Sequence, residues 1–373
     1  MFMFFNAPYE EYEEELRVKR RRLRDANTPI DLPEEEFMKE YRVSKKVFMT
    51  IFNEVTPKIK RKHRTTAIPE ITRLACFLSA LAGNYQSRVG NNSNTAVSQA
   101  MASKIVGDYL EIFEDHFCDK WISLEMTEQE EKKVKLKFYN ETEVPSIIGC
   151  VDCTHIAIQC PRLDTSHLYR NDTGGFSINA LIICDVDLMV RYIDARNPGE
   201  NDDDFVWQKS DPNLYFKSKY DAGKRNFWLI GDTDFKLQPY LMTPYREPVE
   251  SYEVNYNEKC LKAQSIMEKC LNAIESRFPV LTHPKGMHYL PEKATKIINV
   301  CCAIHNACVF YKDDLPKSDK TFLNVDKQKQ RDIDDSESYD SDVSEFNNEM
   351  GVPNEVLRIR EKLAKSLRDE KCV

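Results

Sequence analysis

The sequence predicts an α/β fold, in which a mixed sheet flanked by helices follows an all-helical N-terminal region. Apolar runs rich in β-branched residues fall between positions 146 and 232 and have the length of buried strands. Runs with helical period precede them from residue 34 and follow them from residue 263. Acidic side chains interrupt or end the apolar runs at Asp152 and Asp232, where burying a carboxylate is unfavourable unless it is paired or binds a metal.

The composition is that of a soluble globular protein. The chain has 373 residues, of which 41% are hydrophobic and 31% charged, enough for one large domain or two smaller ones. We find no apolar run long enough to span a membrane, and the N-terminus lacks the basic start and cleavage site of a secretory signal. The net charge of −8 comes largely from residues 326–349, so it says little about whether the folded body binds nucleic acid.

Changes in composition divide the chain into five segments. These are a charged arm (1–33), a helical domain (34–135), a strand-containing domain (136–312), an acidic disordered linker (313–349) and a C-terminal helix (350–373). The arm is expected to be a helix, acidic first and basic after. Its basic part, residues 17–24, is interpretable as a nuclear-localisation signal, a phosphate-binding arm or a solvated helix face.

The helical domain contains a candidate DNA-binding motif. Residues 83–106 pass from a Gly/Asn/Ser-rich stretch into a helical pattern capped by Asn94 or Thr95, which outlines a helix-turn-helix. Two packed antiparallel helices would give the same pattern. Upstream, a basic cluster expected in a loop supplies candidate DNA contacts: Arg61, Lys62 and Arg64.

The order of elements after residue 146 is that of a ribonuclease-H-like fold. Strands are predicted at 147–159, 177–185 and 189–195, with a tight turn that accounts for Asp185. A short helix near 205–209, the strand that ends at Asp232 and the helix that contains Glu268 follow. In that fold, acids on the first strand, after the fourth strand and on a late helix meet at one edge of the sheet.

Asp152, Asp232 and Glu268 are therefore the candidate catalytic and metal-binding residues. Their convergence would form an oxygen-lined site for Mg²⁺ or Mn²⁺, the cations that carboxylates prefer, and such sites cleave phosphodiesters. Zinc is not expected, although Cys150 and Cys153 have zinc-ligand spacing. In a strand these two side chains face opposite sides, and we interpret the twelve cysteines as reduced core thiols.

Several motifs, taken in order, resemble those of the PIF/Harbinger transposases and the nucleases derived from them. The match spans roughly residues 35–312. Residues 149–156 (GCVDCTHI) resemble the family signature G-x-[VI]-D-G-T-H-I. The other matching segments are 95–106, 231–245 (GDTDFKLQPYLMTPY), 267–281 (MEKCLNAIESRFPVL) and 296–309 (KIINVCCAIHNACV).

The resemblance implies a DDE nuclease domain of ribonuclease-H-like fold over residues 136–312. It places the triad on Asp152, Asp232 and Glu268 and implies hydrolysis of DNA with two divalent metal ions. It further implies a location in the nucleus, with the cytoplasm as an additional compartment, and a separate Myb/SANT-like or related DNA-binding partner.

The residues beside the triad depart from the family pattern. Cys153 replaces a glycine, Asp234 and Phe235 replace Gly-Tyr, and Asp202 and Cys260 stand where the family has histidines. These changes support a second hypothesis, a domesticated, non-cleaving DNA-associated regulatory scaffold.

Three residues near the acids have two interpretations each. His155 is an auxiliary site residue or, because it faces away from Asp152 in a strand, a structural histidine bonded to a neighbouring backbone group. Asp203 is an auxiliary acid or a helix N-cap, and the cap is favoured. Arg277 contacts a DNA phosphate or pairs with Glu275 or the tail.

Overall fold

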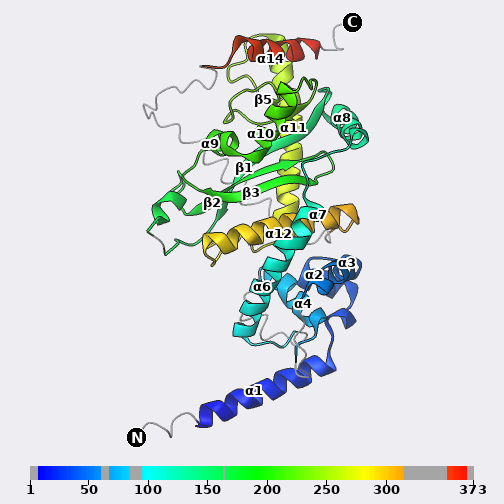
Figure 1. Ribbon diagram of the computed structural model, residues 1–373, viewed down its shortest axis with the longest axis vertical. Helices are drawn as coiled ribbons and strands as arrows, with labels where there is room; N and C mark the ends of the chain where they lie inside the picture. The colour runs from blue at the N-terminus through cyan, green and yellow to red at the C-terminus, as the bar shows by residue number, and fades with distance from the viewer. Residues whose placement is uncertain (1–6, 60–66, 85–94, 163, 315–350, 368–373) are drawn as a thin grey trace.

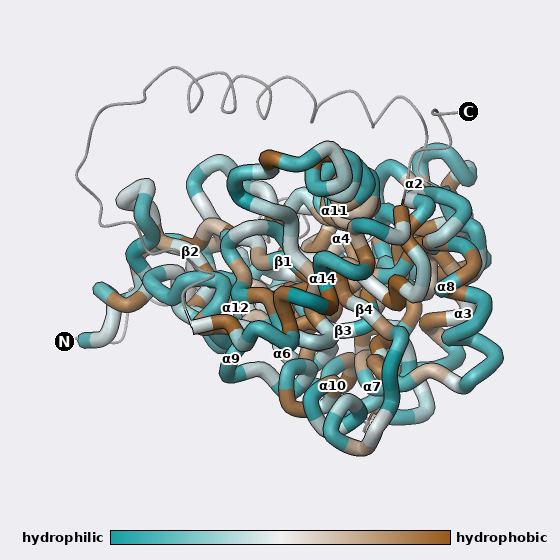
Figure 2. The backbone as a smooth tube through the Cα atoms, turned by 90° about the horizontal axis from the view of Figure 1, so that it is seen from above, coloured by the Kyte–Doolittle hydropathy of each residue, from teal (hydrophilic) through white to brown (hydrophobic). Residues whose placement is uncertain are grey.

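A five-stranded mixed sheet organises the chain (Figure 1). Helix α11 crosses one of its faces, and helix α12 lies between the sheet and the N-terminal helices. Figure 2 shows the hydrophobic segments gathered toward the interior and the hydrophilic ones around the periphery. The computed structural model describes residues 7–59, 67–84, 95–162, 164–314 and 351–367.

The strand order is β3-β2-β1-β4-β5. The first three strands are antiparallel, and β4 and β5 run parallel to β1. This topology confirms the predicted α/β class and the ribonuclease-H-like order. The strands are β1 (Ile147–Ala157), β2 (Ser177–Cys184), β3 (Val190–Pro198), β4 (Trp228–Ile230) and β5 (Leu241–Met242).

Each face of the sheet has its own apolar cluster because successive side chains along a strand point to opposite faces. On one face, Val151 of β1 packs with Trp207 of α9 and Phe216 of α10. On the other, Cys150 packs with α11 and α12. The sequence pattern predicted α9 but neither α10 nor the two-residue β5. The helices are α9 (Asp203–Lys209), α10 (Asp211–Asp221), α11 (Ser251–Arg277) and α12 (Pro291–Phe310).

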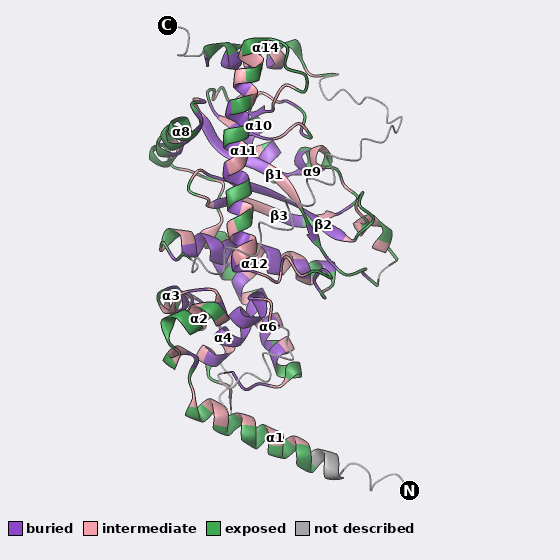
Figure 3. Cartoon of the chain, turned by 180° about the vertical axis from the view of Figure 1, so that it is seen from behind, coloured by how far each residue is buried: buried purple, intermediate pink, exposed green. Residues whose placement is uncertain are grey.

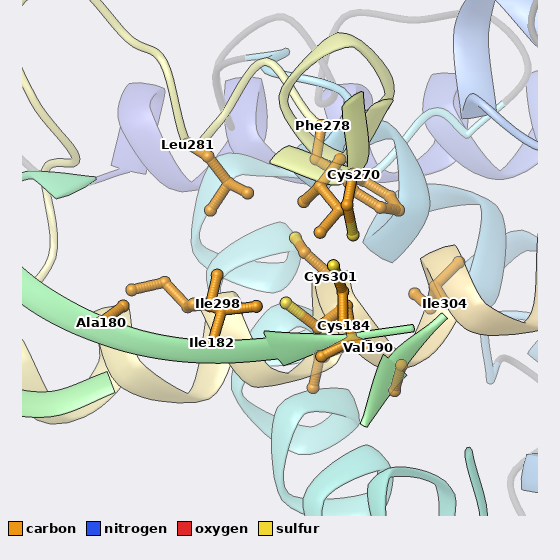
Figure 4. Close-up of a cluster of buried hydrophobic side chains, with 14 of the residues drawn as sticks. Ala180, Ile182, Cys184, Val190, Cys270, Phe278, Leu281, Ile298, Cys301 and Ile304 are labelled. Atoms are coloured by element: carbon orange, nitrogen blue, oxygen red, sulfur yellow. The ribbon is translucent and has the colours of Figure 1, made fainter. Parts of the chain in front are cut away.

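The core beneath β2 and β3 is rich in sulfur. Figure 4 shows Cys184, Cys270 and Cys301 among aliphatic side chains of the strands and of α11 and α12. All three are fully buried, and the cysteines of the described chain are free thiols. Cys150 donates its Sγ proton to the Ala263 carbonyl on the α11 side, so the prediction of reduced core thiols is confirmed for these positions.

Polar side chains of α12 hold the helical layer against the sheet. The Asn306 amide donates to the carbonyl oxygens of Val190 (2.7 Å) and Trp121 (2.8 Å) and accepts from the Val190 N–H. One apolar core runs from the N-terminal helices through α12 to the sheet. These helices are α2 (Glu34–Tyr41), α3 (Lys45–Val55), α4 (Glu70–Leu81), α6 (Gln99–Phe113), α7 (Asp119–Trp121) and α8 (Glu128–Thr142). The predicted domain boundary at 135/136 falls inside α8.

The candidate helix-turn-helix corresponds to α4 and α6, which pack against each other. The cap of α6 is Ser98, whose Oγ accepts from the Met101 N–H, and not Asn94 or Thr95. A helix-turn-helix joins its helices through a turn of about three to four residues. Here α4 ends at Leu81 and α6 begins at Gln99, but residues 85–94 between them lie outside the described residues, so the helix-turn-helix stays a prediction.

The two ends of the described chain are helical. Helix α1 (Ala7–Ala26) projects from the helical layer, and α14 (Asn354–Ser366) packs on α11. The Arg360 guanidinium of α14 lies 3.9 Å from the centre of the Tyr245 ring. In the part of the chain that the structure describes, we find no helix of sufficient length and apolarity for a transmembrane span.

Candidate active site

Parallel pairing of β1 and β4 brings two of the predicted acids together. Cys150 lies opposite Ile230 in the register of this pair. Asp152 and Asp232 each follow two positions later, and side chains two positions apart share a face of a strand. The two carboxylates therefore occupy neighbouring positions at the edge where β4 ends.

The electrostatics of the two acids show their proximity. Burial raises the pKa of Asp152 to about 7, and the negative charge of Asp232 adds to the increase. Burial also raises the pKa of Asp232 to about 6, with Asp234 as the main charge contribution. The strongest charges acting on Asp152 come from Asp232, Asp203 and Asp234, and all are negative.

Each carboxylate accepts a hydrogen bond from a nearby backbone N–H. Asp152 Oδ1 accepts from Cys153 N at 2.8 Å, and Asp232 Oδ1 accepts from Asp234 N at 3.0 Å. These bonds fix one oxygen of each group, while neither supplies the positive charge that would balance the site.

The donor set suits a divalent cation. Neighbouring carboxylates that raise one another's pKa are stabilised by a hard cation, and oxygen ligands favour Mg²⁺ or Mn²⁺. Among the described residues, however, no three His, Cys, Asp or Glu side chains stand close enough together to hold a metal ion. The structure thus shows a pair of candidate ligands, Asp152 and Asp232, and not a closed triad.

Glu268 lies on α11 with an exposed side chain, and the structure does not bring it to the pair. Lys259 of the same helix forms an ion pair with Glu143, which precedes β1. Glu268 comes nine positions after Lys259, which at 3.6 residues per turn is the opposite side of the helix.

Asp202, and not Asp203, caps α9. The Asp202 carboxylate accepts from the Phe205 N–H at 2.7 Å. Asp203, the cap favoured from sequence, accepts instead from the Asn179 amide of β2 at 2.8 Å, and burial raises its pKa. The prediction missed by one residue because three consecutive aspartates, Asp202 to Asp204, span the start of the helix. Sequence reasoning missed Asn179 as the partner of Asp203. Its signal in the sequence is a polar amide within an otherwise apolar strand.

His155 bonds a side chain and not the backbone. Its Nδ1 lies 2.8 Å from Ser177 Oγ on the adjacent strand. Its charge acts to lower the pKa of Asp203, which places the imidazole near Asp203. The expectation that His155 is structural is supported, with Ser177 as the partner.

Arg277 is a structural residue. Its side chain is buried, donates to the Arg42 carbonyl at 2.7 Å and lies 3.7 Å from the Asp313 carboxylate. Burial leaves a DNA phosphate no access to it, so the predicted DNA contact is corrected to an internal ion pair. The other predicted contacts, Arg61, Lys62 and Arg64, lie outside the described residues.

Packing accommodates two departures from the family pattern, whereas a third changes the site. Phe235 is buried and meets the Trp207 ring edge-on at 6.4 Å between centroids. Cys260 is fully buried. Asp234 instead adds a negative charge beside Asp232 and contributes to its raised pKa.

The sheet order and the paired acids define a class, the DDE endonucleases. The family model described as DDE superfamily endonuclease matches residues 151–306, from β1 to α12. This range contains Asp152, Asp232 and Glu268.

The relatives narrow the class to one family. The protein named "Putative nuclease HARBI1" of Bos taurus is 31% identical over 290 residues, 77% of this chain and 80% of that protein. Its Homo sapiens counterpart is 32% identical over 261 residues, 69% and 72% of the two chains. "Protein ALP1-like" of Arabidopsis thaliana is 25% identical over 214 residues, 52% and 51%. No solved structure matches. The chain belongs to the Harbinger transposase-derived nuclease family.

Proposed function

We propose that this protein is a metal-dependent DNA endonuclease that hydrolyses phosphodiester bonds at Asp152, Asp232 and Glu268. Membership of the family supports a nuclease. The observation that supports the chemistry is the pair of half-buried acids on adjacent parallel strands, each with a raised pKa.

Asp152 and Asp232 are the residues that would hold the cations. A bound divalent cation supplies an acidified water and neutralises charge on the leaving oxygen. Because the pKa of Asp152 is about 7, protons compete with the cation for this carboxylate near neutral pH. Asp203 and Asp234 keep the local potential negative. Glu268 of α11 is the third proposed ligand.

A plasmid assay tests this proposal. We expect the purified protein with Mn²⁺ to nick supercoiled plasmid, and Asp152→Ala and Asp232→Asn to remove the activity. Asp187→Asn is the matched control, because Asp187 is an exposed acid that pairs with Lys137. Equal nicking by all four proteins, or none by the wild type, would contradict the proposal.

The exposed position of Glu268 favours a second candidate, the non-cleaving DNA-associated scaffold. Calorimetry with Mn²⁺ separates the two. The nuclease binds Mn²⁺ and loses affinity in both Asp152→Asn and Glu268→Gln, whereas the scaffold binds none. If only Asp152→Asn lost affinity, the proposed metal site would stand and Glu268 would not be one of its ligands.

A nuclear location and a Myb/SANT-like or related partner complete the proposal, supported by the family resemblance alone. The basic part of α1 is the candidate import signal. Replacing Arg20, Arg21 and Arg22 by Ala in a fluorescent fusion should move it from the nucleus to the cytoplasm, and an unchanged distribution would exclude this segment as the signal.

A further inference from the structure

Helix α1 extends from the molecule as a single rod (Figures 1 and 3). Its base is attached where Arg24 Nη1 donates to the Ala96 carbonyl at 2.5 Å. From Glu11 to Leu23 its side chains are exposed or only partly buried, and Tyr12 keeps 57% of its surface in contact with solvent. Tyr12, Leu16, Lys19 and Leu23 are spaced 4-3-4, the spacing of a coiled-coil seam.

The ion pairs within α1 are weak. Arg17 lies 3.4 Å from Glu14, and Arg21 lies 3.8 Å from Asp25. All four side chains are more than half exposed, and pairs of this kind contribute little to stability. The charges of α1 therefore remain available to a partner.

The charges of α1 reverse sign about Leu16. An acid lies one, three and five positions before Leu16, and a base lies one, three and five positions after it. The matched positions are Glu15 and Arg17, Glu13 and Lys19, and Glu11 and Arg21.

We propose that α1 pairs with α1 of a second copy of this chain, antiparallel and crossing at Leu16. In this two-fold arrangement the acidic half of each α1 lies along the basic half of the other, so one surface is complementary to itself. At the crossing point Leu16 of one copy meets Leu16 of the other.

Other partners satisfy fewer of these features. A parallel pair would set acid against acid and base against base. A DNA duplex would attract the basic half and repel the acidic half. Because α1 is only about 30 Å long and its charges are exposed, the association should be concentration-dependent and weakened by salt.

Charge-reversal variants of the full chain test the proposal. One variant makes α1 predominantly acidic (Arg17→Glu, Lys19→Glu and Arg21→Glu), and the other makes it predominantly basic (Glu11→Lys, Glu13→Lys and Glu15→Lys). We expect the wild type to dimerise in sedimentation equilibrium at low salt between about 1 and 100 µM. Each variant alone should associate at least about tenfold more weakly, and a 1:1 mixture should regain dimers. Circular dichroism checks that helix content is preserved.

Three outcomes would overturn the pairing: a wild type that stays monomeric up to about 100 µM, variants that dimerise as the wild type does, or a mixture that stays monomeric. A monomeric wild type together with tighter duplex binding by the basic variant would assign α1 to DNA. These measurements concern association alone, so their outcome is independent of whether the protein cleaves DNA.

Discussion

Two aspartates of the same sheet, Asp185 and Asp152, differ in how their charge is accommodated. Asp185, at the end of β2, is fully buried, accepts from the N–H groups of Asp187 and Met189 and pairs with Arg191 at 2.7 Å. Asp152 is half-buried and accepts from the neighbouring Cys153 N–H. Among charged groups, Asp232 has the strongest effect on its pKa.

The difference separates an acid whose charge is balanced by a cation from an acid whose charged neighbours are also negative. Burial raises the pKa of both groups, but Arg191 opposes the increase at Asp185, whereas Asp232 adds to it at Asp152. A balanced carboxylate stabilises its turn. An unbalanced carboxylate destabilises the native state, and the proposed function predicts that a bound cation would remove this cost.

The largest effect is expected from removing the balanced acid. Asp185→Ala leaves Arg191 and two backbone N–H groups without their acceptor, so the free energy of unfolding should fall by about 3–5 kcal/mol. Urea denaturation measures it. The double variant Asp185→Ala/Arg191→Met should recover part of the loss because it removes the unpaired charge. A loss below about 1 kcal/mol would mean that the two acids do not differ in the way described.

At neutral pH, Asp152→Asn is expected to change the free energy of unfolding in the opposite direction from Asp185→Ala. Its folded pKa of about 7 exceeds the unfolded value of about 3.9, so the native state binds more protons between these values and stability falls as pH rises through this window. Between pH 4.5 and 7.5 the wild type should lose about 3 kcal/mol more than Asp152→Asn. Thermal denaturation measures this. If the stability of the two proteins changed with pH in the same way, the charge of Asp152 would be balanced by its surroundings.

The effect of Mn²⁺ on thermal stability also tests whether the charge of Asp152 is unbalanced. At pH 7.5 the cation should raise the Tm of the wild type by binding the native state, and it should have no effect on Asp152→Asn. The control Asp187→Asn should respond as the wild type does. A similar rise in all three proteins would place the bound Mn²⁺ elsewhere.

The smallest effect distinguishes the two neighbouring acids of α9. Asp202→Ala should lower the free energy of unfolding by about 1 kcal/mol through loss of the cap. Asp203→Asn keeps a side chain that can bond Asn179 and removes a negative charge, so it should not be destabilising. The reverse ranking would return the cap to Asp203.

Local pattern was sufficient for most of the fold. The apolar runs predicted β1, β2, β3 and β4, and helical period predicted α11 and α12, because each of these elements buries a face over several residues. It failed for β5, whose two residues (Leu241–Met242) show no period. The motifs around Asp152 and Asp232 were likewise sufficient to predict that these two acids lie close together.

By itself, the sequence determined the order of elements, the family and the identity of the acids, because these depend on neighbours along the chain. Only the tertiary structure decided which charged side chains are held inside the fold and which are exposed. Arg277 pairs with Asp313, Asp203 bonds Asn179 and Glu268 remains exposed on the flank of α11. Each outcome depends on where a helix meets a distant strand or segment, and a rotation of a fraction of a turn changes it without altering the periodicity.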